Sequence, residues 1–310
     1  MRNLFCVLVV IVGCFEARAQ KGTNPDKSTF PFHYVYKYFE KSNDQVTVRK
    51  SGFKKTWGGH SFRSNLGQMA LDHQWFEMEQ KVGASVFKVT REEGHEQVKI
   101  HFGTAFYVGN DMALTNLHVL GRDNPDLTYC PRLKMRLPAK SMRRYTFTCE
   151  KVLFCSSQLD VCLLKLKIPK GLKRRKGIKA LDDQLDPIQF HVLDLATLGQ
   201  DFHAGAFGNP QGYGIQASWG KGLRKLGHRL IHHASLYHGN SGGPLVDEQG
   251  RSVGVVYAMS GGLLVGPKVR GYASDNRELL SKLAGKLGKN FLSKFQLSSA
   301  AQALVKTFKD

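Results

Sequence analysis

Short strand-like runs follow one another through the middle of the chain, with no long helical pattern between them. The clearest runs are residues 86–89, 98–102, 105–108, 152–154, 161–166 and 252–257, and Gly, Asn, Asp and Pro punctuate them. With 42% hydrophobic residues among 310, the chain has enough apolar material for a packed core. Many short strands without intervening helices predict an all-β sandwich or barrel over residues 80–275.

The two flanks of this region have different patterns. Residues 20–79 are polar and irregular, which indicates an N-terminal extension packed on the main domain, or a pro-segment. Leu280, Leu283, Leu287 and Phe291 recur at spacings of three and four. This spacing predicts an amphipathic α-helix within residues 276–310, docked on the barrel. Contact of the helix lysines with a membrane surface is the alternative.

The N-terminus has the pattern of an export signal. A positive start at Arg2 is followed by an apolar run over residues 4–15 and by Ala17-Arg18-Ala19. This order predicts a signal peptide over residues 1–19 and a secreted or periplasmic protein. Residues 11–14 also resemble a bacterial lipobox, so a lipid anchor on Cys14 is the alternative. The apolar run is shorter than the roughly 20 residues of a spanning helix, and we expect no membrane span.

Four cysteines follow the predicted signal peptide: Cys130, Cys149, Cys155 and Cys162. In an oxidising compartment they could form up to two disulfides, with three possible full pairings. Because Cys162 lies inside an apolar strand pattern, we expect it to be a free buried thiol. The sequence has no C-x-x-C pair, and we expect neither a structural metal nor a cofactor.

Basic residues exceed acidic ones, 45 against 25, which gives a formal charge of +20. Solvated loops are the favoured explanation for the two densest basic clusters. The alternative is contact with an anionic partner such as an acidic substrate, an envelope polymer or nucleic acid. The first cluster comprises Arg132, Lys134, Arg136, Lys140, Arg143 and Arg144, and the second Lys170, Lys173, Arg174, Arg175, Lys176 and Lys179.

The segment of residues 238–246, HGNSGGPLV, is the most informative part of the chain. A serine hydroxyl is a poor nucleophile unless a neighbouring base takes its proton. It also benefits from backbone N–H groups aimed at the oxyanion that forms on a substrate carbonyl. Glycines beside Ser241 allow the tight turn that such a geometry requires. A glycine-rich turn with an incidental serine would explain this segment alone.

Two further segments supply an imidazole and a carboxylate. His118 follows a strand-like run and a turn, and Asp160 stands at the head of the apolar run 161–166. Singly, each has a structural explanation, as a core histidine and a strand-capping acid. Together they give the chain order His, Asp, Ser. The G-x-S-x-G elbow of α/β-hydrolases requires a histidine after the serine, and no histidine follows Ser241. An esterase or lipase of that kind is therefore excluded.

These segments resemble those of trypsin-like, chymotrypsin-fold serine peptidases, particularly the bacterial branch of HtrA and V8-like enzymes. The resemblance covers roughly residues 80–275. It implies two antiparallel six-stranded β-barrels with the active site in the cleft between them. Only 35 residues follow Asp275, so we expect no PDZ domain. The matching segments are residues 103–106, 114–119, 160–166, 208–212 and 239–246.

The resemblance also implies the role of each site residue. Ser241 attacks the scissile carbonyl, His118 transfers the proton, and Asp160 orients His118. The N–H groups of Gly239 and Ser241 form the oxyanion hole. The expected activity is that of a serine endopeptidase acting on protein or peptide substrates. A catalytically silent relative that binds anionic partners through its basic clusters is the alternative, and the oligomeric state is not predictable.

Alignment with the family gives an expectation for the substrate pocket. Ser235 occupies the position at the base of the pocket, and because it is not an acid, a strong Lys or Arg preference is not expected. Val256 and Met259 lie along the pocket wall, with Met259 where a glycine would leave the pocket open. We therefore expect a shallow pocket that accepts small or medium apolar side chains. Asn240 replaces the acid of zymogen-activated relatives, so activation by N-terminal insertion is not expected.

Overall fold

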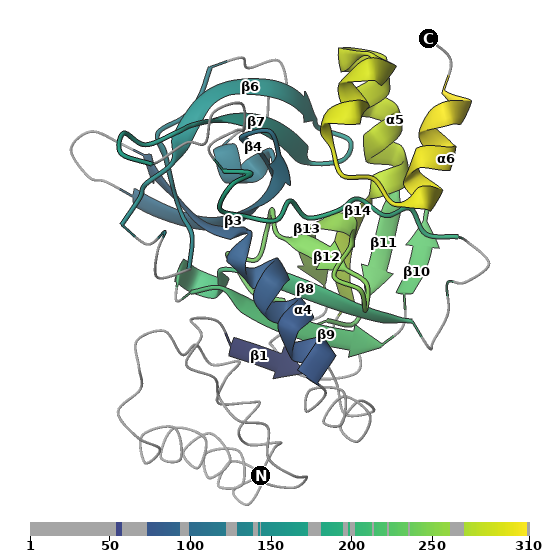
Figure 1. Cartoon of the computed structure of the whole chain (residues 1–310). Coiled ribbons are helices and arrows are strands. Elements are labelled where there is room, and N and C mark those ends of the chain that lie inside the picture. Colours follow the sequence, from purple (N-terminus) through teal and green to yellow (C-terminus); the bar gives the residue numbers. More distant parts are fainter. Residues whose placement is uncertain are drawn as a thin grey trace, which may run out of the picture.

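The computed structural model describes part of the 310-residue chain (Figure 1). The described residues are 54–57, 73–93, 99–121, 129–138, 142, 144–172, 181–194, 198, 202–212, 214–221, 223–234, 236–260 and 270–308. The predicted signal peptide and Cys14 lie outside them. Within this part of the chain, no helix has the length and apolar character needed to cross a bilayer.

Six antiparallel strands form the first barrel, in the order β5-β2-β3-β4-β7-β6. A bridge between Met135 and Phe147, with N–H···O distances of 2.8 and 2.9 Å, joins the two outermost strands and closes it. Alternate side chains face the core, as in β5, where Leu133 and Met135 are buried and Lys134 and Arg136 are exposed. The strands are β2 (Val86–Glu93), β3 (Lys99–Gly109), β4 (Met112–Thr115), β5 (Leu133–Arg136), β6 (Thr148–Ser156) and β7 (Val161–Lys167).

The second barrel is a curled sheet in the order β1-β9-β8-β12-β13-β14-β11-β10. It has eight strands, two more than the expected six. One of the two is β1 (Lys54–Trp57) from the N-terminal extension, which pairs in parallel with β9. The remaining pairings are antiparallel, so the predicted chymotrypsin-like fold is confirmed. The other strands are β8 (His203–Gly208), β9 (Gln216–Lys221), β10 (Leu223–Leu226), β11 (Arg229–His232), β12 (Pro244–Val246), β13 (Ser252–Ser260) and β14 (Arg270–Asp275).

Helix α4 (His73–Ala84) attaches the end of the extension to the second barrel (Figure 1). Its Glu79 is fully buried and accepts a hydrogen bond of 2.7 Å from the Nε1 of Trp219 on β9. Val82 joins the hydrophobic core. The residues before 80 are therefore not wholly irregular.

The C-terminal region contains two α-helices, where the sequence predicted one. Helix α5 (Asn276–Leu287) begins where the Asp275 carboxylate accepts a 3.0 Å hydrogen bond from the Arg277 amide, and it buries Leu280 and Leu283 as expected. It ends at Gly288, whose φ is +85°. Phe291 therefore lies in the 3₁₀ helix η5 (Lys289–Lys294), and α6 (Ser299–Thr307) follows.

The prediction of a free thiol at Cys162 is wrong. Among the described residues there are two disulfides, Cys130–Cys149 and Cys155–Cys162. Cys162 is buried as expected, but the register of β6 and β7 sets it directly opposite Cys155, with a Cα–Cα distance of 4.1 Å. Residues that face each other across an antiparallel pair come close enough for a disulfide.

The segment that links the two barrels is held on both sides. Phe190 forms parallel bridges with Ser252 in β13 and with Leu297 near the C-terminus. Its amide donates to Gln296 O at 2.8 Å, and the amide of His191 donates to Ser252 O at 2.7 Å. The link is therefore built into the same packing as the C-terminal helices.

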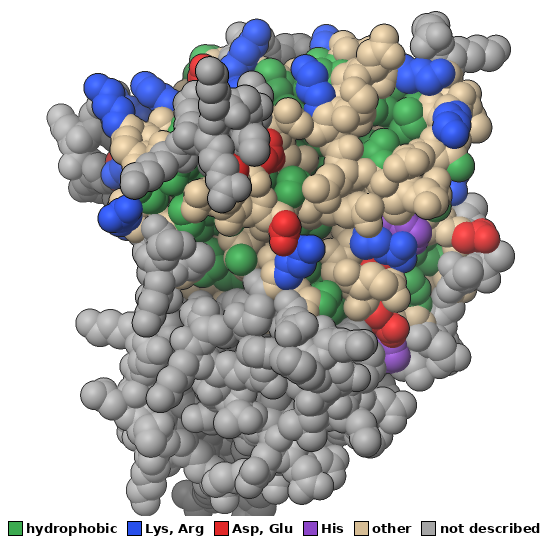
Figure 2. Space-filling model, in the orientation of Figure 1, with side chains coloured by type: hydrophobic (Ala, Val, Ile, Leu, Met, Phe, Trp, Pro, Cys, Tyr) green, Lys and Arg blue, Asp and Glu red, His purple; other side chains and the backbone are tan. Residues whose placement is uncertain are grey.

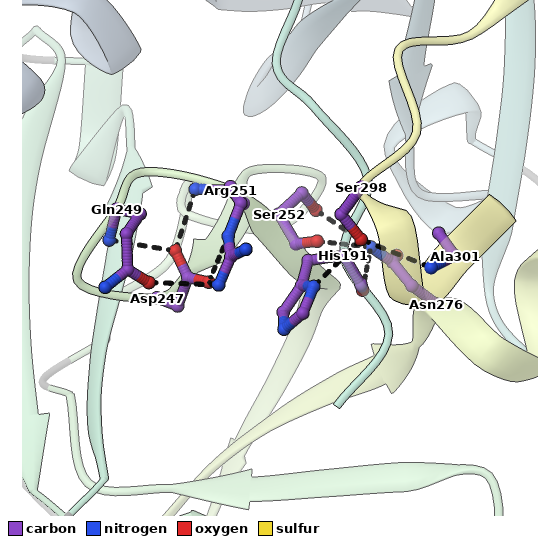
Figure 3. A network of polar contacts seen from close by, with 8 residues as sticks. All are labelled: His191, Asp247, Gln249, Arg251, Ser252, Asn276, Ser298 and Ala301. Carbon is purple, nitrogen blue, oxygen red and sulfur yellow. Dashed lines mark hydrogen bonds and ion pairs between the residues drawn. The ribbon is translucent and has the colours of Figure 1, made fainter. Parts of the chain in front are cut away.

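Side chains reinforce this junction (Figure 3). Nδ1 of His191 lies 2.9 Å from Ser298 Oγ, and the same hydroxyl accepts from the Ala301 amide at 3.2 Å to cap α6. Burial, with a smaller contribution from Arg251, lowers the pKa of His191. Nearby, Asn276 donates to Ser252 O at 2.6 Å. A largely neutral His191 is therefore part of the contact that holds the C-terminal helix.

Candidate active site

His118 lies immediately after a fully buried strand of the first barrel. Strand β4 ends at Thr115, and His118 begins the short 3₁₀ helix η2 (His118–Leu120). Gly121, with φ +76°, closes this turn by donating its N–H to His118 O at 2.9 Å. The backbone of His118 is thus fixed, while its side chain is 48% exposed and accessible to a reactant.

Asp160 contacts His118 through both carboxylate oxygens. Oδ2 lies 2.5 Å from the imidazole Nδ1, and Oδ1 accepts from the His118 amide at 3.0 Å. A carboxylate on Nδ1 favours the tautomer with the proton on that nitrogen. Nε2 is then left as a hydrogen-bond acceptor, which is the state required of a general base.

The backbone of Asp160 has an unusual conformation that its neighbours support. Its φ is +51°, in the left-handed region that non-glycine residues adopt at a cost of about 1 kcal/mol. Its carbonyl accepts from Asn116 Nδ2 at 2.6 Å and from the Leu117 amide at 3.3 Å. On the preceding residue, Leu159 O accepts a hydrogen bond from Ser274 Oγ of the second barrel. These contacts fix the direction of the carboxylate.

Ser241 lies in a tight loop whose other amides are engaged. The amide of Asn240 donates to Tyr237 O, and the amide of Gly243 donates to Asn240 O, both at 3.0 Å. Gly239 and Gly242 have φ values of +101° and +86°, which glycine tolerates without strain. Among the hydrogen bonds of the described residues, none has the N–H of Gly239 or Ser241 as donor.

The Ser241 loop packs against strands β3 and β4 of the first barrel. The amide of Thr104 on β3 donates to Ser241 O at 2.8 Å. A Cβ at Gly242 would lie 2.1 Å from Thr104 O and 2.5 Å from Thr115 Oγ1, so this position has space only for glycine. The nucleophile candidate and the base candidate therefore come from adjoining segments of the two barrels.

The expected pocket residues are only partly brought together. Val256 is buried, and its backbone pairs with Gly243 and Gly242 at 2.9 and 2.8 Å. Met259, farther along β13, is 38% exposed. Ser235 lies outside the described residues. The structure thus sets one expected wall residue beside the Ser241 loop.

The sequence analysis did not identify Tyr257 as an irregular position of strand β13. The register of β13 against β14 pairs Val256 with Ala273 and Ala258 with Tyr272, so Tyr257 is the extra residue of a β-bulge. Among the described residues its hydroxyl is buried without a hydrogen-bond partner, and burial raises its pKa. A bulge becomes visible only in the pairing register of two strands, here β13 and β14. No residue pattern in the sequence indicated this one.

Comparisons with known proteins give one family match. Residues 103–255 match the trypsin-like peptidase domain, a range that contains His118, Asp160 and Ser241. No curated protein matches the chain. Among solved structures, the HtrA-type protease AlgW with a decapeptide has a TM-score of 0.50 at 16% identity. The match covers 69% of this chain and 67% of that chain, and it shows a shared fold.

Proposed function

Residues 103–255 are a trypsin-like peptidase domain, and from this premise we propose that the protein is a serine endopeptidase acting through an acyl-enzyme. The observation that supports the proposal best is the double contact between Asp160 and His118, at 2.5 and 3.0 Å. It prepares the imidazole of His118 to accept a proton, and the Ser241 loop is hydrogen-bonded through Thr104 to the same barrel that carries His118. A peptidase domain with that arrangement has the parts that acyl transfer requires.

In the proposed reaction, Ser241 Oγ attacks the scissile carbonyl while its proton passes to Nε2 of His118. Asp160 stabilises the resulting imidazolium and keeps its proton on Nδ1. His118 then protonates the leaving amine, and the acyl group stays on Ser241. A water molecule, deprotonated by His118, attacks the acyl-enzyme, and the serine and the free acid are released.

The amides of Gly239 and Ser241 are the proposed donors to the oxyanion. Donors held in position before the reaction lower the barrier, because they need no reorganisation as the charge forms. Two hydrogen bonds within the loop, from the amides of Asn240 and Gly243, and one from the Gly242 amide to Val256 O on β13 provide such rigidity.

For the substrate, we propose peptides or proteins cleaved after small or medium apolar residues. Support comes from Met259, which lies on β13 three residues beyond Val256, the residue whose backbone pairs with Gly242 and Gly243 of the Ser241 loop. The neighbour AlgW was solved with a decapeptide, which agrees with peptide substrates. Export by the signal peptide of residues 1–19 is part of the same proposal, because both disulfides suit an oxidising compartment.

The basic clusters support a second, separate proposal of contact with anionic polymers. Figure 2 shows several Lys and Arg side chains over the first barrel, at the upper left. Arg132 and Arg136 of the first cluster are exposed, whereas Lys134 pairs with Glu92. Binding to a heparin column that is lost at moderate salt, and is weakened in Arg132→Ala/Arg136→Ala, would support this contact. Equal retention of both proteins would refute it.

Covalent labelling by a fluorophosphonate probe tests the main proposal. The probe reacts with an activated serine, so the native chain should label while Ser241→Ala should not. His118→Ala should label far more slowly, because the hydroxyl loses its base. Equal labelling of native protein and Ser241→Ala, or labelling of neither, would favour the catalytically silent alternative.

A further inference from the structure

Thr104, on strand β3 of the first barrel, is hydrogen-bonded to the loop of Ser241 at two points. The residue is fully buried. Its hydroxyl donates to Gly239 O at 2.6 Å, and its amide donates to Ser241 O at 2.8 Å. One residue of the first barrel thus binds the carbonyls of both proposed oxyanion-hole residues in the second.

The hydroxyl of Thr104 is itself held in a defined direction. It accepts a hydrogen bond of 2.9 Å from the amide of Asn209. Asn209 is fully buried as well, and its side chain donates to Gly103 O at 3.3 Å and accepts from the Gly214 amide at 3.1 Å. With Asn209 as donor, the single hydrogen of the Thr104 hydroxyl is directed to Gly239 O.

Gly239 is the point in the loop where such support has the largest effect. Its φ of +101° belongs to a region where glycine has wide conformational freedom. A small rotation there would turn the Gly239 amide away from the developing oxyanion. The bond from Thr104 fixes the carbonyl on the far side of the same residue and thereby limits that rotation.

We propose that Thr104 is a positioning residue that sets the oxyanion-hole amides of Gly239 and Ser241 through its paired hydrogen bonds to their carbonyls. The inference rests on the proposed serine peptidase function and adds a residue to it. Thr104 does not contact His118 or Asp160 in any hydrogen bond of the described residues. Its loss should therefore change oxyanion stabilisation and leave the proton transfer pair intact.

The experiment compares Thr104→Val, which keeps the shape and removes the hydroxyl, with Thr104→Ser, which keeps the hydroxyl. In Thr104→Val, Gly239 O loses its buried donor, and we expect kcat and the fluorophosphonate labelling rate to fall about 10- to 100-fold. KM should stay within about twofold, and the pH midpoints of kcat/KM should stay unchanged. Thr104→Ser should restore kcat to within about threefold of the native value.

Ser85→Ala is the matched control. Ser85 is buried and its Oγ donates to Asp186 O at 2.7 Å, so this variant also removes a buried hydroxyl, but one whose bond involves no residue of the Ser241 loop. It should lower Tm by a similar amount while kcat stays within about twofold. A kcat loss equal to that of Thr104→Val would show that the effect is only one of general packing, and would overturn the proposal.

A native kcat in folded Thr104→Val would also overturn the proposal. If Thr104→Val does not fold, Asn209→Ala is the variant that tests the proposal. It removes the side-chain hydrogen bonds that hold Asn209 in place, and so loosens the backbone amide that orients the Thr104 hydroxyl. A drop in kcat with native KM supports the proposal, and native kcat overturns it. Failure of the native chain to label at all would instead refute the proposed function, so the two failures are distinguishable.

Discussion

His232 should make the second barrel sensitive to acid. The residue lies on β11 and is fully buried, and among the described residues neither ring nitrogen has a hydrogen-bond partner. Its ring lies over the backbone of Gly271, where an added Cβ would be 2.2 Å from Cε1. Burial, followed by the neighbouring His233, lowers its pKa from 6.5 to about 3. The folded protein therefore holds this imidazole neutral.

The size of the effect follows from proton linkage. Because the pKa is lower in the folded state than in the unfolded one, the unfolded chain takes up a proton first as pH falls. The contribution of His232 to the free energy of unfolding is therefore fully present above a pH of about 6.5. It is lost progressively as the pH falls towards about 3. For this one group, the loss between pH 7.5 and pH 5 is about 2 kcal/mol, and about 3 kcal/mol by pH 4.

Urea unfolding of the oxidised protein at these pH values measures the loss. His232→Leu removes the titrating group, so its free energy of unfolding should decline about 2 kcal/mol less than that of the native protein between pH 7.5 and pH 5. His238→Gln, at an exposed histidine of the following loop, is the control and should follow the native curve. The reasoning is refuted if His232→Leu loses as much stability as the native protein over the same interval.

Three further outcomes are expected. Asn116→Ala should lower kcat/KM about tenfold with a small change in Tm, because the Asp160 carbonyl loses its 2.6 Å hydrogen-bond donor. Steady-state kinetics with a peptide substrate measures this effect, and a native kcat/KM would contradict it. Met259→Gly should shift cleavage towards larger residues in a peptide-library profile, and an unchanged profile would refute its place in the pocket. Removing the Cys130–Cys149 disulfide by a double Ala substitution should cost about 3 kcal/mol in urea unfolding, from the closure entropy of a loop with a separation of 19 residues; a cost near zero would contradict the entropic argument.

Four strands of the first barrel, β2, β3, β6 and β7, were predictable because each contains a run of apolar residues bounded by turn residues, whereas β4 and β5 coincide with none of the predicted runs. The runs 98–102 and 105–108 were both found, although Gly103 suggested a break that the structure does not have, since β3 is continuous from Lys99 to Gly109. A glycine in a strand also arises where another group approaches closely. Here a Cβ at Gly103 would lie 2.6 Å from Val119.

Features that depend on pairing between distant segments could not be predicted. Cys162 has an apolar context in the sequence, and only the register of β6 against β7 sets Cys155 opposite it. Thr104 gave no signal of its own, since its contacts with Gly239 and Ser241 span 135 and 137 positions. The left-handed backbone conformation of Asp160 could not be predicted either, because the hydrogen bond that supports it comes from Asn116, 44 positions earlier in the chain.

The bridges on either side of Phe190 have a mechanical consequence. A bilobal enzyme can open and close by bending at an unsupported peptide between its lobes, but here Phe190 in that peptide forms bridges with Ser252 and with Leu297. Bending it would break hydrogen bonds to Ser252 and Gln296 together. The two barrels should therefore keep one relative orientation, and hinge bending at this link should not occur.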